Sequence, residues 1–134
     1  MDWRRCLMDG RDLAGADLTG AVLRDASLSR AKLAGAQLQK VDGLNVRFGF
    51  ADLTGADLQG AVLSNAEMTR TVLRGAQLQH ADLRRARLFA ADLSGADLTG
   101  ARLDGTDLLN ATLDGARWTD GKRICDTGSI GSCR

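Results

Sequence analysis

A five-residue repeat runs through most of this chain and restricts the folds open to it. Residues 91–105 contain three consecutive copies, each with leucine at its centre. Followed in both directions in steps of five, the frame holds from Met8 to Trp118 and gives 23 units over residues 6–120. Leucine occupies 18 of the 23 centres, and alanine occupies 17 of the 23 positions two residues earlier. A pattern this regular indicates a repeat architecture in which each unit packs on its neighbours.

A period of five fits neither an isolated helix nor a flat strand. On an α-helix each step of five turns about 140° around the axis, so the leucines would spread over all sides. In a strand an odd period sends successive leucines to opposite faces. A chain that turns a corner once per unit keeps every centre on one axis. The repeat therefore predicts a coil whose centre positions point inward.

A second period sets the number of corners in each coil. Glycine stands two residues after the centre in every fourth unit, from Gly15 to Gly115 in steps of 20. Another column of the same spacing, one residue before the centre, reads Asp17, Gln37, Asp57, Gln77, Asp97 and Arg117. Stacked amides and opposite charges are favourable in such columns. The superperiod predicts four units per coil, with five full coils over residues 6–105 and three sides of a sixth.

The most regular units spell out a known pattern. The sequence Ala-Asp-Leu occurs at 16–18, 51–53, 56–58, 81–83, 91–93 and 96–98. This A-(D/N)-L-x-x pattern resembles that of the pentapeptide-repeat proteins. The resemblance implies an all-β fold: a right-handed quadrilateral parallel β-helix of about six coils, with the Leu and Ala positions inside.

The ends of the chain leave the regular pattern. We expect residues 1–5 to form an N-terminal cap, residues 6–120 the β-helix, and residues 121–134 a C-terminal capping tail. Solenoids need such caps, because an uncovered end exposes apolar core and unpaired strand groups. Trp3 and Trp118 both fall on the centre frame, so we expect them to cover the two open ends.

One unit breaks the core pattern, because Gly43 stands where leucine belongs. An empty leucine site would cost about 2–5 kcal/mol. Two explanations are open. Val41, Val46 and Phe48 supply the missing volume, or a local bulge turns Leu44 inward.

The three cysteines carry information on the compartment. Cys6 takes an inward position, which predicts a small core residue. Cys125 and Cys133 are eight residues apart in the tail and either form a disulfide or remain free thiols. A bridge would point to an oxidising compartment. Structural zinc needs four ligands, and the tail contains no histidine.

The net charge and the lengths of the apolar runs limit the kinds of partner that the chain can have. The chain has 18 basic and 17 acidic residues, and the coils over residues 6–120 carry a net charge of −2. We therefore expect no nucleic-acid partner. No apolar run approaches the roughly 18 residues of a membrane span, and no signal segment is recognisable. The chain as given is expected to be cytoplasmic, or periplasmic or exported if Met1 replaces a removed leader and the tail cysteines are bridged.

Large apolar side chains gather at outward positions on one side. Phe50, Phe89 and Leu109 fall there, and Phe50 lies between Arg30 and Arg70 in its column. These residues are interpreted either as scattered surface residues with cation–π packing or as a patch for a protein partner or self-association.

The sequence offers no catalytic constellation or cofactor motif. The single histidine, His80, takes an outward position, and no phosphate loop, nucleophile elbow or metal cluster is present. We expect a non-enzymatic scaffold that needs no cofactor and binds an unidentified protein. The family resemblance supplies an alternative, a mimic of DNA that binds DNA gyrase, as quinolone-resistance proteins of this family do.

Overall fold

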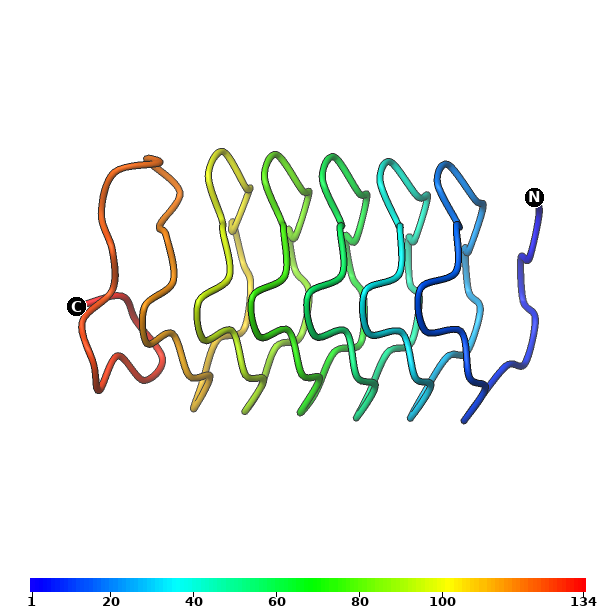
Figure 1. Ribbon diagram of the computed structural model, residues 1–134, viewed down its shortest axis with the longest axis horizontal. Coiled ribbons are helices and arrows are strands. Elements are labelled where there is room, and N and C mark those ends of the chain that lie inside the picture. Colours follow the sequence, from blue (N-terminus) through cyan, green and yellow to red (C-terminus); the bar gives the residue numbers. More distant parts are fainter.

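A computed structural model describes all residues 1–134. The chain winds as a regular coil, with its N-terminus at one end and its C-terminus at the other (Figure 1). The structure contains no helix and no strand longer than one bridge residue, because each unit consists of one bridge residue followed by a two-residue turn. The corner in every unit keeps the extended segments this short.

The chain returns to the same side every 20 residues. Each bridge residue pairs in parallel with the residue 20 positions later, as Asp52 does with Val72. We number the sides by their bridge residues, in steps of 20: Asp2 to Arg102 form the first side, Leu7 to Asp107 the second, Asp12 to Thr112 the third, and Asp17 to Arg117 the fourth. The prediction of four units per coil is confirmed.

Backbone hydrogen bonds join each coil to the next. Leu53 N–H donates to Val72 O at 2.7 Å, and Val72 N–H donates back to Ala51 O at 2.9 Å. The turn closes where Ala56 N–H donates to Leu53 O at 3.0 Å. Gly55, third in that turn, has φ +66°, as a type II turn requires. The backbone polar groups are therefore satisfied between levels and at the corners.

The centre leucines and the alanines before them fill the interior. Most of them belong to one cluster of 37 buried residues that extends from Met8 to Cys125. Two inward positions hold threonine instead of alanine. Thr71 is fully buried, and its hydroxyl donates to Phe48 O at 2.8 Å. The narrow axis thus accepts a polar side chain where a carbonyl of the preceding coil receives its hydrogen.

Residues 1–5 differ from the expected separate cap, because they form a further repeat. Asp2 makes a parallel bridge to Val22, and Cys6 N–H closes a turn to Trp3 O at 3.1 Å. Trp3 is half-buried against the core cluster. The first coil therefore begins at Met1, and residues 1–120 make up six coils of 20 residues.

At Gly43 the frame does not bulge. Gly43 N–H donates to Val62 O at 2.7 Å, and Val46 N–H closes the usual turn to Gly43 O at 3.0 Å. A Cβ atom on Gly43 would lie 3.1 Å from Leu63 Cδ2 and 3.2 Å from Val46 Cγ1. Neighbouring side chains thus occupy the space, and Leu44 remains half-buried on the outside of the turn.

Candidate functional site

The apolar patch predicted from the sequence lies along the second side and its corner. Phe50 is 49% exposed and Leu109 is 61% exposed, whereas Phe89 is half-buried. Phe50 is the third residue of its turn, with φ +59°, and this left-handed conformation places its ring outside the coil. Phe89 and Leu109 belong to consecutive coils, since Ala90 N–H donates to Leu109 O at 2.9 Å.

The two arginines beside Phe50 differ. The guanidinium carbon of Arg30 lies 4.7 Å from the centroid of the Phe50 ring, which is cation–π geometry. Arg70 is exposed and makes no such contact with the ring. The structure therefore brings Arg30 and Phe50 together, and it leaves Arg70 and Leu109 accessible.

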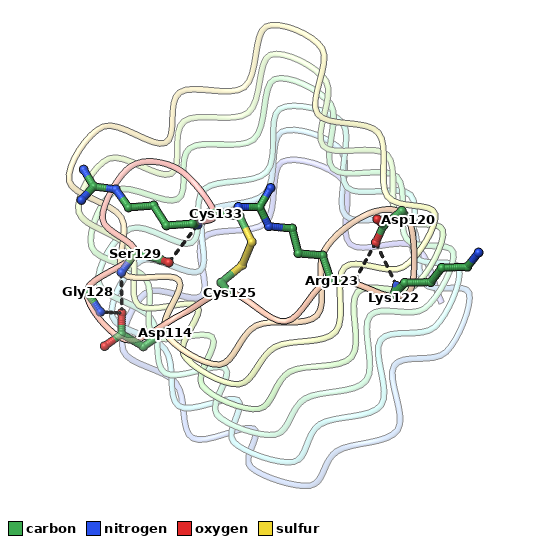
Figure 2. Close-up of a disulfide and its surroundings, with 9 residues drawn as sticks. Asp114, Asp120, Lys122, Arg123, Cys125, Gly128, Ser129 and Cys133 are labelled. Carbon is green, nitrogen blue, oxygen red and sulfur yellow. Dashed lines mark hydrogen bonds between the residues drawn. A yellow bond between two sulfur atoms is a disulfide. The ribbon is translucent and has the colours of Figure 1, made fainter.

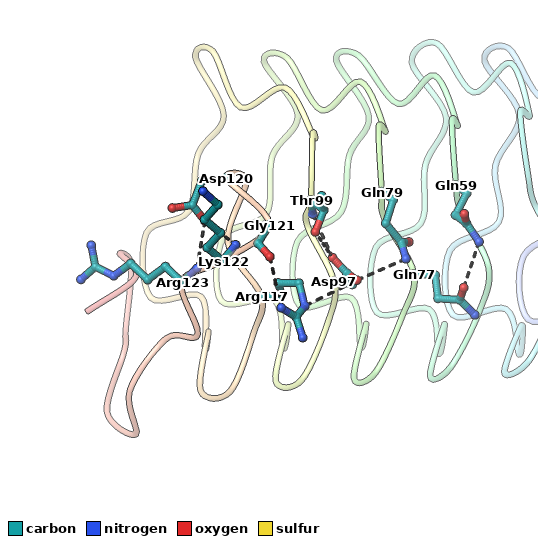
Figure 3. Close-up of polar contacts among 10 residues, drawn as sticks. All are labelled: Gln59, Gln77, Gln79, Asp97, Thr99, Arg117, Asp120, Gly121, Lys122 and Arg123. Atoms are coloured by element: carbon teal, nitrogen blue, oxygen red, sulfur yellow. Dashed lines mark hydrogen bonds and ion pairs between the residues drawn. The ribbon is translucent and has the colours of Figure 1, made fainter.

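A ladder of polar side chains runs along the fourth side (Figure 3). Gln59 Nε2 donates to Gln77 Oε1 at 2.9 Å, and Gln79 Nε2 donates to Asp97 Oδ2 at 3.2 Å. Arg117 Nε lies 3.9 Å from the same carboxylate. The links from Gln59 to Gln77 and from Gln79 to Asp97 join residues 18 apart in neighbouring columns, so the columns spaced by 20 do not predict them. The ladder pairs the amide nitrogens of Gln59 and Gln79, whereas Gln79 Oε1 is buried without a hydrogen-bond partner.

The repeated aspartates brace the turns. In the unit around Leu98, Asp97 Oδ1 accepts hydrogen bonds from the backbone N–H and the hydroxyl of Thr99, at 3.0 and 2.6 Å. Thr19 binds Asp17 in the same way, and its hydroxyl holds the pKa of the Asp17 carboxyl below the ordinary value. These carboxylates therefore have local structural partners.

The surface has only shallow hollows. The largest has a volume of about 480 Å³ and is open to solvent, lined by Gln39, Lys40, Gln59, Gly60, Gln79 and His80. The His80 ring lies over Gly100 in the next coil, and none of the six ion pairs of the structure includes His80. No group of three or more His, Cys, Asp or Glu side chains lies close enough to hold a metal ion.

The tail folds back over the C-terminal end of the coil (Figure 2). Ile124 pairs antiparallel with Arg117, and Ile130 with Thr112. Cys125 and Cys133 form a disulfide whose Cα atoms are 4.9 Å apart, and Cys125 is buried. Trp118 is half-buried against the core beneath this tail.

Two carboxylates hold the tail in place. Asp114 Oδ1 accepts the backbone N–H groups of Gly128 and Ser129, at 3.0 and 3.1 Å. Asp120 Oδ1 accepts those of Lys122 and Arg123, at 2.8 and 2.9 Å. The backbone donation from Arg123 is the main cause of the lowered pKa of Asp120.

These features define a parallel β-helical repeat protein with four five-residue units to a coil. The chain belongs to the pentapeptide-repeat family, whose model of pentapeptide repeats matches eight copies over residues 12–42, 51–89 and 91–117. Its coil is the right-handed quadrilateral β-helix of that family. No helix in the structure has the length and apolar character to cross a membrane.

Several solved structures are similar to this chain. HetL, a pentapeptide-repeat protein involved in heterocyst differentiation regulation in the cyanobacterium Nostoc sp. strain PCC 7120, is 31% identical over 84% of this chain and 54% of its own, with a TM-score of 0.41. This chain thus spans about half the length of HetL.

Two more similar structures come from different settings. Rfr23 from the cyanobacterium Cyanothece 51142 is 27% identical over 84% of this chain and 88% of its own, with a TM-score of 0.40. QnrB1, a plasmid-mediated fluoroquinolone resistance protein, is 22% identical over 82% and 69%, with a TM-score of 0.39. A search of curated proteins finds no match.

Proposed function

We propose that this chain is a non-enzymatic scaffold that binds another protein through the patch of Phe50, Phe89, Leu109, Arg30 and Arg70. The observation that carries the proposal is the exposure of Phe50 and Leu109, 49% and 61%, on a protein whose other bulky apolar side chains are mostly inside. Aromatic residues and arginine are the residue types most enriched at binding hot spots.

The coil supports this role because it is rigid. The coils that carry Phe50 and Phe89 are hydrogen-bonded to the coils above and below, and Leu109 O accepts from Ala90 N–H in the coil below. The backbone of the patch is therefore fixed in place before a partner arrives. Association then costs little ordering of the scaffold. The Arg30–Phe50 contact also holds the ring in one orientation.

Alanine substitution tests the patch. Replacing Phe50, Phe89 and Leu109 together should abolish capture of the partner from host extract by the immobilised protein, with little change in melting temperature. Val62→Ala is the matched control, because Val62 is an exposed apolar residue on a different side. Capture that survives the triple substitution would remove the patch as the binding surface.

The disulfide supports a proposed oxidising compartment, because bridges persist in the periplasm and outside cells and are rare in the cytosol. Trapping thiols with an alkylating agent in intact host cells tests this point. Alkylated Cys125 and Cys133 would place the protein in a reducing compartment.

The fourth side gives little support to the alternative of DNA mimicry. Asp57 there accepts hydrogen bonds from Gln39 and Gln59, and Asp97 faces Arg117. A run of free carboxylates is the feature that a duplex mimic requires. A gyrase supercoiling assay with the purified chain checks the alternative, and inhibition or protection from a quinolone would favour it over the scaffold.

A further inference from the structure

At the C-terminal end of the coil, the tail accepts backbone hydrogen bonds from only two of the four sides. On the third and fourth sides, Leu113 N–H donates to Ser129 O and Trp118 N–H donates to Arg123 O, both at 2.8 Å. On the first and second sides the corresponding N–H groups have no backbone partner: those of Leu103, Gly105, Leu108 and Asn110. An open strand edge of this kind is a template for pairing with another chain.

The first coil of the 134-residue chain has the matching open edge. Between coils, a centre residue donates its N–H to the carbonyl 19 positions later, as Leu83 does to Arg102. A further coil stacked on the last one would therefore offer Leu103 the carbonyl of its first bridge residue, which corresponds to Asp2. It would offer Leu108 the carbonyl of its second bridge residue, which corresponds to Leu7. The carbonyls of Asp2 and Leu7 accept no backbone hydrogen bond. The first coil of a second copy would therefore continue the ladder in register.

Charges on the first side match in the same register. Arg4 binds Asp2 through Nη2 at 2.7 Å, and Arg84 binds Asp82 in the same way at 2.8 Å. One coil after Asp82 and Arg84 come Arg102 and Asp104, in the opposite order of charge. Arg102 forms a parallel β-bridge with Asp82. In a stack, Asp2 of the second copy would lie next to Arg102, and Arg4 would lie next to Asp104. Each charge of the last coil would then have an opposite charge on both sides, since Asp82 and Arg84 precede it by one coil.

The second side supplies an apolar contact. Leu7, at 79%, and Leu109, at 61%, are among the most exposed apolar side chains of the protein, and they lie on this one side at opposite ends. If the second copy continues the coil, its Leu7 takes a place 18 positions after Leu109 of the first copy. Asp9 and Ser27 on the same side have that spacing, and their side chains are hydrogen-bonded. The two leucines would therefore touch.

The tail blocks this stacking. Ser129 and Arg123 occupy the places that residues 12 and 17 of a second copy would take. The disulfide ties Cys125, which is paired to the last coil through both its N–H and its C=O, to Cys133 near the chain end.

We propose that the disulfide-held tail is a gate on head-to-tail stacking of this chain. When a dithiol reduces the bridge, two electrons and two protons pass to the two sulfurs, and the dithiol is oxidised to its own cyclic disulfide. The tail then leaves the last coil, and the first coil of a second copy takes its place. Both ends of the stack remain open, so growth continues beyond a dimer.

Sedimentation velocity with and without dithiothreitol tests the gate. The oxidised chain should remain a monomer at all concentrations, and the reduced chain should form dimers and longer species as concentration rises. Leu7→Asp should abolish this growth. Val62→Asp should leave the growth unchanged, because Val62 is also a bridge residue but lies in a middle coil, away from both ends. A reduced chain that stays monomeric, or growth that survives Leu7→Asp, would overturn the proposal.

A mixing experiment tests the head-to-tail geometry and shows that both variants are folded. Reduced Leu7→Asp has an intact tail end, and reduced Leu109→Asp has an intact first coil. Each alone should be monomeric, and the mixture should give one-to-one dimers that do not grow. Pairing of two identical ends would give no such complementation and would refute the geometry.

An exchange of charges provides a second variant. Asp2→Arg with Arg4→Asp keeps the local ion pair but places like charges against Arg102 and Asp104, so stacking should weaken at least tenfold. Unchanged stacking would contradict the proposed register. The scaffold proposal is separable from this one, because neither Leu7 nor the exchanged pair belongs to its patch.

Discussion

At the scale of single residues, Gly43 shows how the core tolerates an exception. The sequence indicates an empty leucine site, and Leu63 of the next coil and Val46 occupy the space instead. Phe48, fully buried in the adjoining unit, adds volume at the same level. The core is therefore full at a position where the repeat pattern predicts a gap.

The tightness of this site leads to a prediction. Gly43→Ala places a methyl group 3.0 Å from Val62 O and close to Leu63, so it should destabilise the fold by about 1–3 kcal/mol, as overpacking does. Gly49→Ala is the control, since its methyl group would meet only Thr69 O at 3.8 Å. Urea unfolding measures both. Equal midpoints would show that the site has free space.

The aspartates give a prediction on protonation. Removing the Thr19 hydroxyl in Thr19→Val should raise the pKa of Asp17 toward the ordinary 3.8, because that hydroxyl is the main cause of its lowering. Thr119→Val is the control, since Arg117 stands two residues before Thr119 in place of an aspartate. Carbon NMR titration of the carboxyl groups measures the change. An unaltered Asp17 titration would rule out the hydroxyl as its cause.

The same shifts set the direction of acid sensitivity. Asp17, Asp82 and Asp120 have lowered pKa values in the folded chain, the second through Arg84. Their contribution to stability is fully present above the ordinary aspartate pKa and is lost as the pH falls through the lowered, folded value. Thermal unfolding should therefore be unchanged between pH 7 and 5 and should shift to lower temperature below about pH 4. A melting temperature that stays constant down to pH 2 would contradict this.

At the scale of structural elements, the corners of the coil and the C-terminal cap are stabilised by different interactions. Every corner is stabilised locally by its turn hydrogen bond, and an aspartate adds a second hydrogen bond in units such as those of Asp17, Asp52 and Asp97. The cap has few buried side chains and depends on the disulfide and on two carboxylates. It is the part of the molecule with the least support from its own packing.

Loss of the bridge should therefore loosen the cap first. Cys133→Ser should lower the free energy of unfolding by about 2–3 kcal/mol, as expected for a short loop. Hydrogen exchange should rise at the amides of Leu113 and Trp118, which the tail covers, and remain slow at Leu93 and Leu98 one coil below. Cys6→Ala, which leaves the bridge intact, is the control. Uniform loss of protection along the coil would mean that the cap does not open separately.

At the scale of the whole molecule, the periods of five and 20 contain nearly all of the fold. They predict four sides, the inward leucines and the stacked columns, because each follows from the geometry of a chain that turns at every unit. The role of residues 1–5 was missed, since Trp3 keeps the frame while the alanine position before it lies at the start of the chain. The tail escaped prediction in detail because residues 121–134 have no period, and its antiparallel return depends on contacts with the last coil.

The candidate site was only partly accessible from the sequence. The patch residues follow from their frame positions, but the choice of Arg30 over Arg70 as the partner of Phe50 depends on which way each side chain leans. The open edges at the two ends appear only once the hydrogen bonds are assigned. The sequence alone does not indicate that the tail accepts hydrogen bonds from two sides and leaves the N–H groups of the other two without a backbone partner.

The stacking of every residue on the one 20 positions away limits how such a chain can change in length. An insertion of one residue would rotate all later side chains out of their columns, and an insertion of five would move each of them to a neighbouring side. Only a complete turn of 20 preserves every column, and it adds about 4.8 Å to the rod. The distance between two features on the same side can therefore change only in whole coils.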